Sequence, residues 1–389
     1  MLRVLTLSTL FPHAARPTLG VFVERQTLEL AARDDVALEV VSPAGLPAWP
    51  LSRHPHYASL AGLPETEDWK GLAVHRPRYR VWPRIGQAGA ARRMADAVLP
   101  VLREIRARFP FDVIDAQFFW PDGPAAVRLG RALGVPVSIK ARGSDIHVWG
   151  MRPGIGEQVI AAGRAADGLL AVSAALKRDM AALGMPDDRI RVHHTGIDLE
   201  RFRPADRAAA KARLGVDGPL LIGVGALVER KGHHLTIEAL RRLPGATLIV
   251  VGDGPERAGL ARRAARLGVE DRVRFVGNRP HAELPALFAA ADASVLPTVS
   301  EGLANAWVES LACGTPVVTC DVGGAREIID GPAAGRLVAR NAESIAGAVA
   351  ELLAAPPDPA EVRRVAERFG WDWNRDELFA HLCGLARRS

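Results

Sequence analysis

Two glutamates, Glu301 and Glu309, stand eight positions apart in the stretch that carries the clearest sign of chemistry in the sequence. The apolar residues 293–296 before them predict a short buried strand, and helical spacing runs from residue 305 until Gly314 ends it. A carboxylate accepts hydrogen bonds from two adjacent hydroxyl groups. A pair of carboxylates placed before and within one helix therefore suits a sugar diol or a ribose.

The turn between the predicted strand and the predicted helix offers backbone donors to the same ligand. Open α/β sheets bind ligands where a strand ends, and the first N–H groups of a helix have no partner inside it, which favours an anion or a hydroxyl-rich group. The residues that we expect to contact the ligand there are Gly302, Leu303, Ala304 and Asn305. In the alternative interpretation Glu301 is only a turn residue and Glu309 only a solvated helix position.

Two adjacent cations, Arg230 and Lys231, come just before a second predicted helix at 232–243. Such a pair can hold a diphosphate through charge-assisted hydrogen bonds. The loop that contains Gly225, which we also expect at the donor site, is not a dinucleotide fingerprint, because Val228 occupies the place of the third glycine. It is not a P-loop either, because no Ser or Thr follows a Gly-Lys pair. Alone, the two cations would be interpreted as solvated, but the two glutamates favour the functional interpretation.

The stretch 301–318 reads Glu-Gly, six residues, Glu-Ser, one residue, Ala-Cys-Gly, one residue and Pro-Val-Val. It resembles the donor-site signature of the family 4 retaining glycosyltransferases, which have the two-domain GT-B fold. The resemblance implies that Glu301 contacts the donor sugar and that Glu309 holds the ribose of the nucleotide. It also implies that the Arg-Lys pair binds the leaving nucleoside diphosphate and that the loop with Asn278 contacts the base.

The chain has 389 residues and a net charge of +6, from 50 Lys and Arg against 44 Asp and Glu. Its length suggests two domains. The basic surplus does not indicate nucleic acid by itself, since no nucleic-acid module and no interleaved stacking aromatics accompany it. Three cysteines without metal-ligand spacing fit a reducing cytosol. No apolar run reaches transmembrane length, and the first residues favour a buried strand over a signal peptide, so we expect a cytoplasmic protein.

Two series of alternating strands and helices predict two doubly wound α/β domains, each with a mostly parallel sheet. The first series has strands at 3–8, 37–41, 72–79, 113–116, 137–140, 169–172 and 190–193 and helices at 21–32, 88–108, 125–133 and 174–183. The second has strands at 220–224, 246–251, 273–276, 293–296 and 317–319 and helices at 232–243, 256–267, 282–290, 305–313 and 342–353.

These series place an acceptor-side domain at 1–204, a nucleotide-sugar donor domain at 205–370 and a terminal helix at 371–389. In the family that the sequence resembles, two Rossmann-like domains face each other across a cleft. The terminal helix of that family crosses back to the first domain. The resemblance implies the same arrangement for this chain.

Gly20, Arg142 and Asp145 are the residues of the first domain that we expect on the acceptor side. Gly20 stands where the resembling family has a glycine-rich loop. Arg142 stands where the family commonly has a histidine that contacts the donor sugar. One interpretation is that Arg142 pairs with Asp145 or with another acidic residue of the cleft and shapes the loop. The other is that it faces an anionic group of a substrate, since a guanidinium matches a carboxylate and has donors for a phosphate.

The expected chemistry is the transfer of a sugar from a nucleoside-diphosphate sugar to a saccharide or lipid-linked acceptor, in cell-surface polysaccharide or glycolipid assembly. The sequence has no Asp-x-Asp motif, so we expect no metal and no cofactor. The family retains anomeric configuration without an evident protein nucleophile, so we expect front-face transfer with Glu301 orienting the donor sugar. The alternatives are a nucleotide-sugar epimerase of similar build and a non-catalytic nucleotide-sugar binder.

Nine arginines lie between residues 76 and 108, together with Trp82 and Ile85 and few acids. Such a patch could rest on an anionic membrane surface and bring the protein to the inner face of the cell membrane. The alternative is a solvated basic helix. The nine residues are Arg76, Arg78, Arg80, Arg84, Arg92, Arg93, Arg103, Arg106 and Arg108.

Overall fold

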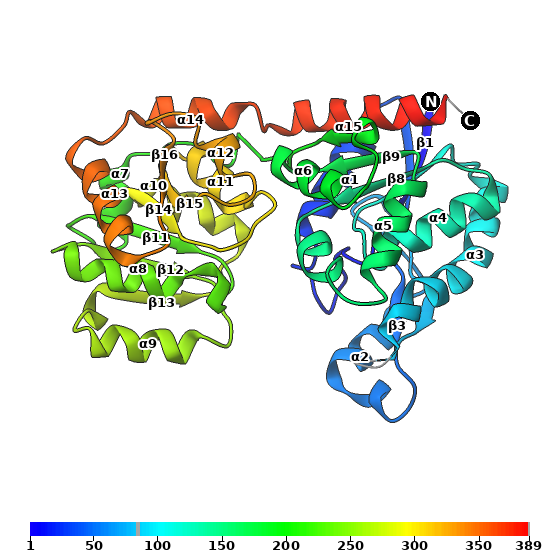
Figure 1. Cartoon of the computed structure of the whole chain (residues 1–389), viewed down its shortest axis with the longest axis horizontal. Helices are drawn as coiled ribbons and strands as arrows, with labels where there is room; N and C mark the ends of the chain where they lie inside the picture. The colour runs from blue at the N-terminus through cyan, green and yellow to red at the C-terminus, as the bar shows by residue number, and fades with distance from the viewer. Residues whose placement is uncertain (83–85, 388–389) are drawn as a thin grey trace. The chain divides into compact units, whose positions relative to one another are not determined.

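The structure is a computed structural model that describes residues 1–82 and 86–387. The chain divides into two compact units (Figure 1). The first unit contains Met1–Gly196 and the C-terminal segment from Asp372 onwards, and the second contains Ile197–Trp371. Each unit is built on a mainly parallel sheet, so the predicted α/β fold class is confirmed.

The first unit contains an eight-stranded sheet in the order β10-β9-β8-β7-β1-β2-β5-β4. Among the described strands of this sheet, β4 alone runs antiparallel, against β5. The strands are β1 (Leu2–Leu7), β2 (Val36–Val41), β4 (Thr66–Trp69), β5 (Leu72–His75), β7 (Val113–Ala116), β8 (Val137–Ala141), β9 (Gly168–Ala171) and β10 (Ile190–Val192). A separate parallel pair is formed by β3 (Ala44–Leu46) and β6 (Arg78–Arg80).

The helices of the first unit include one from the end of the chain. They are α1 (Val21–Ala31), α2 (Pro55–Ala61), α3 (Ala90–Arg108), α4 (Asp122–Leu133), α5 (Gly156–Ala165), α6 (Ala174–Ala182) and α15 (Trp371–Ala386). Helix α15 buries Leu378, Leu382 and Leu385 in one core cluster with Leu2 and Val4 of β1. The last helix therefore belongs to the core of the first unit, through burial of apolar side chains.

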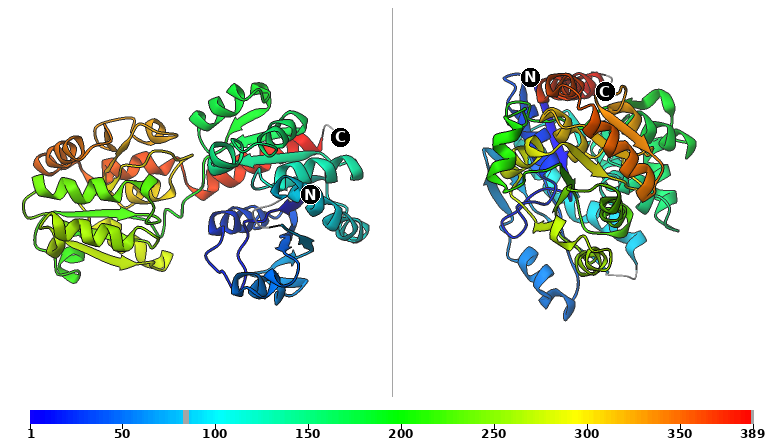
Figure 2. Two further views of the ribbon diagram at one scale, coloured as in Figure 1. Left: turned by 60° about the horizontal axis from the view of Figure 1, so that its bottom comes forward. Right: turned by 90° about the vertical axis from the view of Figure 1, so that its left-hand side faces the viewer.

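The second unit contains a six-stranded parallel sheet in the order β13-β12-β11-β14-β15-β16, with helices on both sides (Figures 1 and 2). Its strands are β11 (Leu220–Val224), β12 (Thr247–Val251), β13 (Val273–Gly277), β14 (Ala293–Leu296), β15 (Val317–Cys320) and β16 (Gly335–Val338). Its helices are α7 (Arg207–Arg213), α8 (His233–Ala239), α9 (Arg257–Arg266), α10 (Leu284–Ala290), α11 (Asn305–Ala312), α12 (Ala325–Ile328), α13 (Ala342–Ala354) and α14 (Pro359–Glu367).

Both sheets reverse their strand order once. In the first unit the chain winds one way from β1 through β2 and the other way from β7 through β8 to β10. In the second unit the reversal lies between β11 and β14. Side chains and loops at the carboxyl ends of the strands beside such a reversal form the usual ligand-binding crevice of open α/β sheets.

Some elements were not predicted from the periodicity of the sequence. The expected strand at 72–79 is two separate strands, β5 and β6. The elements β3, β4 and α2 form most of the segment between residues 44 and 69, and α2 projects from the rest of the first unit (Figures 1 and 2). None of the helices in residues 1–82 and 86–387 has the length and apolar character needed to cross a membrane.

Candidate functional site

The loops after β11 and β14 come into direct contact at the strand reversal of the second unit. The backbone N–H of Val299 donates to the carbonyl of Arg230 at 3.0 Å. Gly232 has a φ of +76°, and a Cβ at this position would lie 2.2 Å from the carbonyl oxygen of Pro297. Glycine is thus required both by the backbone conformation and by the close approach of the two loops.

This contact brings Lys231 onto Glu301. The Lys231 ammonium group forms an ion pair with Glu301 Oε1, and both side chains are 13% exposed. The hydroxyl of Thr298 donates to the same oxygen at 3.2 Å. Because an ammonium group has three N–H donors, donors remain available on Lys231 for a ligand.

Arg230 lies on the solvent side of the same pair. Its Nη1 is 3.8 Å from Glu301 Oε1, and its side chain is 52% exposed. His233, which begins α8, adds no charge, since burial and then the nearby Lys231 lower its pKa to about 4. The positive charge of this loop therefore comes from Arg230 and Lys231.

Glu309 occupies the second turn of α11 and is buried. Its Oε1 lies 2.7 Å from His281 Nε2. The edge of the His281 ring packs against Phe202, with 4.9 Å between ring centroids. Burial, followed by the charge of Glu309, raises the pKa of the neighbouring Cys313 thiol to about 12. Cys313 is thus a protonated core residue, whereas Glu309 is held in place by an imidazole.

The start of α11 lies next to Glu301. Leu303 and Ala304 are buried, and the carbonyl of Gly302 accepts the N–H of Gly324 at 2.8 Å. Gly323 has a φ of +51°, and a Cβ there would stand 1.8 Å from the Glu301 carbonyl oxygen. The predicted turn is therefore fixed by close backbone packing. Among the first N–H groups of α11, that of Trp307 donates to the Ala304 carbonyl at 3.0 Å. Those of Asn305 and Ala306 precede it and have no acceptor inside the helix.

Gly225 and Asn278 are the two other residues that the sequence predicts at the donor site. A Cβ on Gly225 would lie 3.7 Å from the Lys231 side chain, so this glycine borders the cation. Asn278 is exposed in the loop after β13, an edge strand of the sheet. Within the described part of the chain Asn278 forms no hydrogen bond with either glutamate, and its contact with a base stays a prediction.

In the first unit the loop after β8 is organised by Asp145, which is fully buried. Its carboxylate accepts the backbone N–H groups of Phe119 at 3.1 Å, Arg142 at 3.0 Å and Gly143 at 2.8 Å. Burial raises the pKa of Asp145, and these hydrogen bonds oppose the shift. The carboxylate therefore fixes the backbone of the loop.

The Arg142 guanidinium points elsewhere. Its Nε donates to the Gln117 carbonyl at 2.8 Å, another nitrogen donates to the Gln117 side chain, and the group lies 4.6 Å above the Phe22 ring centroid. The expected pairing of Arg142 with Asp145 thus takes the form of backbone hydrogen bonds, and among the described residues the two side chains form no ion pair. Burial lowers the pKa of Arg142 to about 10.

Gly20 begins α1 in a left-handed conformation, with a φ of +61°. A Cβ at Gly20 would lie 2.1 Å from the carbonyl oxygen of Leu10. Glycine is therefore needed to fold the loop after β1 back on itself before the helix begins.

Two family profiles cover most of the chain. Residues 20–201 match Glycosyltransferase Family 4, and residues 205–369 match Glycosyl transferases group 1. The putative teichuronic acid biosynthesis glycosyltransferase TuaC of Bacillus subtilis is 31% identical over 334 residues, which is 83% of this chain and 82% of that protein. The chain belongs to glycosyltransferase family 4.

Other relatives of this glycosyltransferase match over less of their length or only in fold. The D-inositol 3-phosphate glycosyltransferase of Mycobacterium tuberculosis is 38% identical over 212 residues, 51% of this chain and 44% of that enzyme. Sucrose-phosphate synthase from Thermosynechococcus elongatus aligns over 100% of both chains with a TM-score of 0.79 and 21% identity. HepE of Anabaena, solved with UDP, aligns over 99% of this chain and 100% of its own with a TM-score of 0.74 and 20% identity. The fold of this glycosyltransferase is GT-B.

The glycosyltransferase also has site residues that sequence reasoning missed. His281 and Thr298 contact Glu309 and Glu301 directly, and neither stands in a recognisable motif. In the first unit, Lys140 is fully buried and donates to Gln26 Oε1 at 2.7 Å. Burial lowers the pKa of Lys140 well below its usual value. The sequence signal for Lys140 is its position as a lysine within a mainly apolar strand, β8.

Proposed function

We propose that this glycosyltransferase moves a sugar from a nucleoside-diphosphate sugar to a saccharide or lipid-linked acceptor, with retention of anomeric configuration and without a metal ion. The observation that carries the proposal is the contact of Lys231 with Glu301 beside the start of α11, at the strand reversal of the second unit. Two cations and a helix start suit a diphosphate, and the carboxylate suits the hydroxyl groups of the attached sugar.

Each group has a separate role in the proposal. Lys231, Arg230 and the first N–H groups of α11 hold the diphosphate. Glu301 accepts from hydroxyl groups of the donor sugar and keeps Lys231 in position. Glu309, held by His281, accepts from the ribose hydroxyl groups. Two structures of Anabaena HepE, one in complex with UDP and one in complex with UDP-glucose, support a nucleotide-sugar donor.

The transfer itself needs no protein nucleophile in this proposal. The bond between the anomeric carbon and the phosphate oxygen breaks, and the acceptor hydroxyl forms its new bond from the same face. The acceptor proton passes to the departing phosphate. Stabilisation of the leaving charge by preorganised groups contributes roughly 3–4 kcal/mol for each good donor. The absence of an Asp-x-Asp motif supports the assignment of this work to Lys231 and Arg230.

We assign the reaction to cell-surface polysaccharide or glycolipid assembly in the cytoplasm. The name of the Bacillus relative, which contains teichuronic acid biosynthesis, supports this assignment. The name of the mycobacterial relative contains an inositol phosphate, which supports an acceptor with an anionic group.

A nucleotide panel tests the donor side. One of UDP, GDP and ADP is expected to raise the melting temperature, because a ligand that binds only the folded form stabilises it. Glu309→Gln retains one acceptor oxygen but loses the charge, so we expect affinity for that nucleotide to fall about tenfold. Glu343→Gln, an exposed position on α13, is the matched control. Equal affinities of the two variants would remove Glu309 from the site, and no response to any nucleotide would contradict the proposal.

We also propose that the first unit binds an anionic membrane surface, but through a different set of residues than the sequence indicates. Arg76 is 2% exposed and forms an ion pair with Glu67, so it does not belong to a solvated patch. Arg84 and Ile85 lie outside the described residues. Trp49, Leu51 and Trp82 are exposed, close in the chain to the exposed Arg53, Arg78 and Arg80.

Trp49, Trp82 and Arg80 lie at or just beyond the same end of the β3–β6 pair. Leu46 of β3 lies opposite Arg80 of β6, and Trp49 and Trp82 follow these two strand ends within three residues. Aromatic side chains beside arginines suit the interface of an anionic bilayer. The polar arginines would contact the headgroups while the indole rings enter the boundary with the acyl chains.

Flotation with lipid vesicles tests the membrane proposal. We expect recovery with phosphatidylglycerol vesicles and little with phosphatidylcholine vesicles. Trp49 is 72% exposed and Met151 is 70% exposed, so Trp49→Ser is matched by Met151→Ser. Trp49→Ser is expected to lower recovery and Met151→Ser to leave it unchanged. Equal recovery with both lipids would favour a solvated basic surface.

A further inference from the structure

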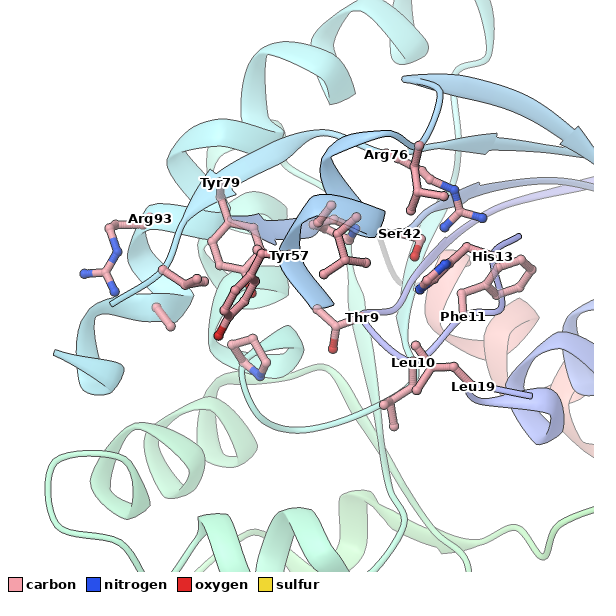
Figure 3. A pocket seen from close by; sticks show the side chains of 18 of the residues that line it. Thr9, Leu10, Phe11, His13, Leu19, Ser42, Tyr57, Arg76, Tyr79 and Arg93 are labelled. Carbon is pink, nitrogen blue, oxygen red and sulfur yellow. The ribbon is translucent and has the colours of Figure 1, made fainter. Parts of the chain in front are cut away.

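The first unit contains a pocket of about 390 Å³, within the range of roughly 300–1,000 Å³ that is typical of small-molecule sites (Figure 3). It lies at the strand reversal of this unit. Thr9 follows β1, Ser42 follows β2 and Trp120 follows β7, and all three line the pocket. The pocket is therefore formed within the first unit alone, where an open α/β sheet binds its ligand.

Much of the wall is apolar or aromatic. The projecting segment contributes Tyr57, Leu60 and Leu63, and the β6 side contributes Tyr79. Figure 3 shows the rings of Tyr57 and Tyr79 close together at one end of the pocket, with Leu10 and Leu19 along another side. Such a wall suits an apolar chain or the face of a sugar ring.

The charged side chains of the wall are all basic. No Asp or Glu stands among the described residues that line the pocket, whereas Arg16, Arg76 and Arg93 do. Arg76 is neutralised by Glu67. Arg93 donates to the backbone carbonyls of Arg80 at 2.8 Å and Gly86 at 2.9 Å. Because these acceptors are neutral, they do not compensate the charge of the guanidinium. Arg16 is exposed and forms no ion pair within the described parts of the chain.

A buried carboxylate, that of Asp122, holds the lining residue Thr9. Asp122 is fully buried and accepts the backbone N–H of Thr9 at 2.9 Å and its hydroxyl at 2.8 Å. Burial raises the pKa of Asp122 to about 7. Asp122 holds Thr9 in place and is not one of the residues that line the pocket, so the charged side chains of the lining remain basic.

We propose that this pocket binds the phosphate group and the adjoining apolar chain of a lipid-linked acceptor. Arg16, in the loop with His13 and Leu19, takes the phosphate, and the wall of Tyr57, Leu60 and Tyr79 takes the chain. The proposal rests on the proposed function and selects the lipid-linked acceptor over the free saccharide. A neutral saccharide would use the aromatic rings but leave Arg16 without an anionic partner, whereas an amphiphilic phosphate satisfies both the cation and the apolar wall.

Farnesyl phosphate, used below the concentration at which it aggregates, is the probe. We expect it to bind the full chain in calorimetric titration, with farnesol and inorganic phosphate each at least about tenfold weaker. Farnesol binding as tightly as farnesyl phosphate would overturn the role of Arg16. Inorganic phosphate binding as tightly would overturn the role of the apolar wall.

Two pairs of matched variants locate the binding. Leu60→Glu adds a carboxylate to the wall and is expected to weaken farnesyl phosphate binding about tenfold or more, whereas Met151→Glu on the exposed surface is not. Arg16→Gln is expected to weaken it about tenfold, whereas Arg131→Gln, exposed at the end of α4, is not. Unchanged binding in both Leu60→Glu and Arg16→Gln would overturn the pocket assignment.

Nucleoside diphosphate binding separates this inference from the proposed function. All folded pocket variants are expected to bind the nucleotide that the wild type binds, because its site lies in the second unit. A protein that binds this nucleotide but not farnesyl phosphate would overturn the pocket assignment alone. A protein that binds methyl glucoside through the pocket and not farnesyl phosphate would replace the lipid-linked acceptor by a free saccharide.

Discussion

Replacement of Glu301 by glutamine is expected to lower kcat roughly 100-fold, the effect of losing one preorganised group or of misplacing a reacting group slightly. Glutamine keeps the shape of the side chain but not the charge that fixes Lys231. Hydroxyl groups of the donor sugar also lose a carboxylate acceptor, and the sugar is then held less firmly in the reactive geometry.

Affinity for the nucleoside diphosphate is expected to respond differently. Glu301→Gln frees the Lys231 ammonium from its ion pair, so diphosphate affinity should stay equal or rise slightly. The measurement is kcat with a saturating donor, together with the dissociation constant of the nucleoside diphosphate. Glu361→Gln on the exposed face of α14 is the control. A kcat within twofold of the wild type, as for the control, would mean that Glu301 does not act in the reaction.

The strands that carry the donor site could be predicted closely from the sequence. The predicted strands 220–224 and 293–296 agree with β11 and β14 to the residue. Both are fully apolar or nearly so and are bounded by turn residues, because a parallel strand with two covered faces reads as a continuous apolar run. The helix start at residue 305 was also predicted, because helical spacing begins there. Gly314 and Pro316 end the same helix.

The pocket of the first unit could not be predicted in the same way. Its walls come from four or more separated stretches, from Thr9 to Trp149, and no spacing rule joins them. The short strand β3 has only three residues, too few for a period to appear, and α2 begins with Pro55 and has seven residues. The strand predicted at 72–79 is divided in two, because the chain leaves the main sheet after His75, at Arg76 and Pro77, and begins β6 at Arg78.

Contacts within the donor site were likewise only partly accessible from the sequence. The residue types of Lys231 and Glu301 indicated a diphosphate and a sugar, but the ion pair between them depends on the approach of two loops that are 70 residues apart. His281 begins a short 3-10 helix that leads into α10, and its contact with Glu309 follows from the packing of α10 beside α11. Periodicity locates elements, whereas such pairs are set by tertiary packing.

Removal of the Lys231 charge is the second large effect that we expect. Lys231→Met keeps most of the side-chain length but loses three N–H donors and the positive charge. Losing a hydrogen bond to a charged group costs about 1.5–3 kcal/mol, so nucleoside diphosphate affinity should fall about 10- to 150-fold. Arg230 is half exposed, and its Nη1 lies 3.8 Å from Glu301 Oε1. We therefore expect that Arg230 does not take the place of the lost Lys231 ammonium group.

The control for this variant is Lys177→Met, which removes a lysine that pairs with Asp187 in the first unit. Its nucleotide affinity should equal that of the wild type. The parent nucleoside, which lacks the diphosphate, should bind Lys231→Met and the wild type equally, since the lost contact is to phosphate.

The central claim is that Lys231 beside Glu301 holds the diphosphate of the donor. Calorimetric titration of the nucleoside diphosphate and the parent nucleoside into the wild type and Lys231→Met tests it most directly. We expect the affinity of Lys231→Met for the nucleoside diphosphate to be about 10- to 150-fold lower than that of the wild type, and its affinity for the nucleoside to be unchanged. Equal diphosphate affinity in the two proteins, with Lys231→Met folded, would contradict it.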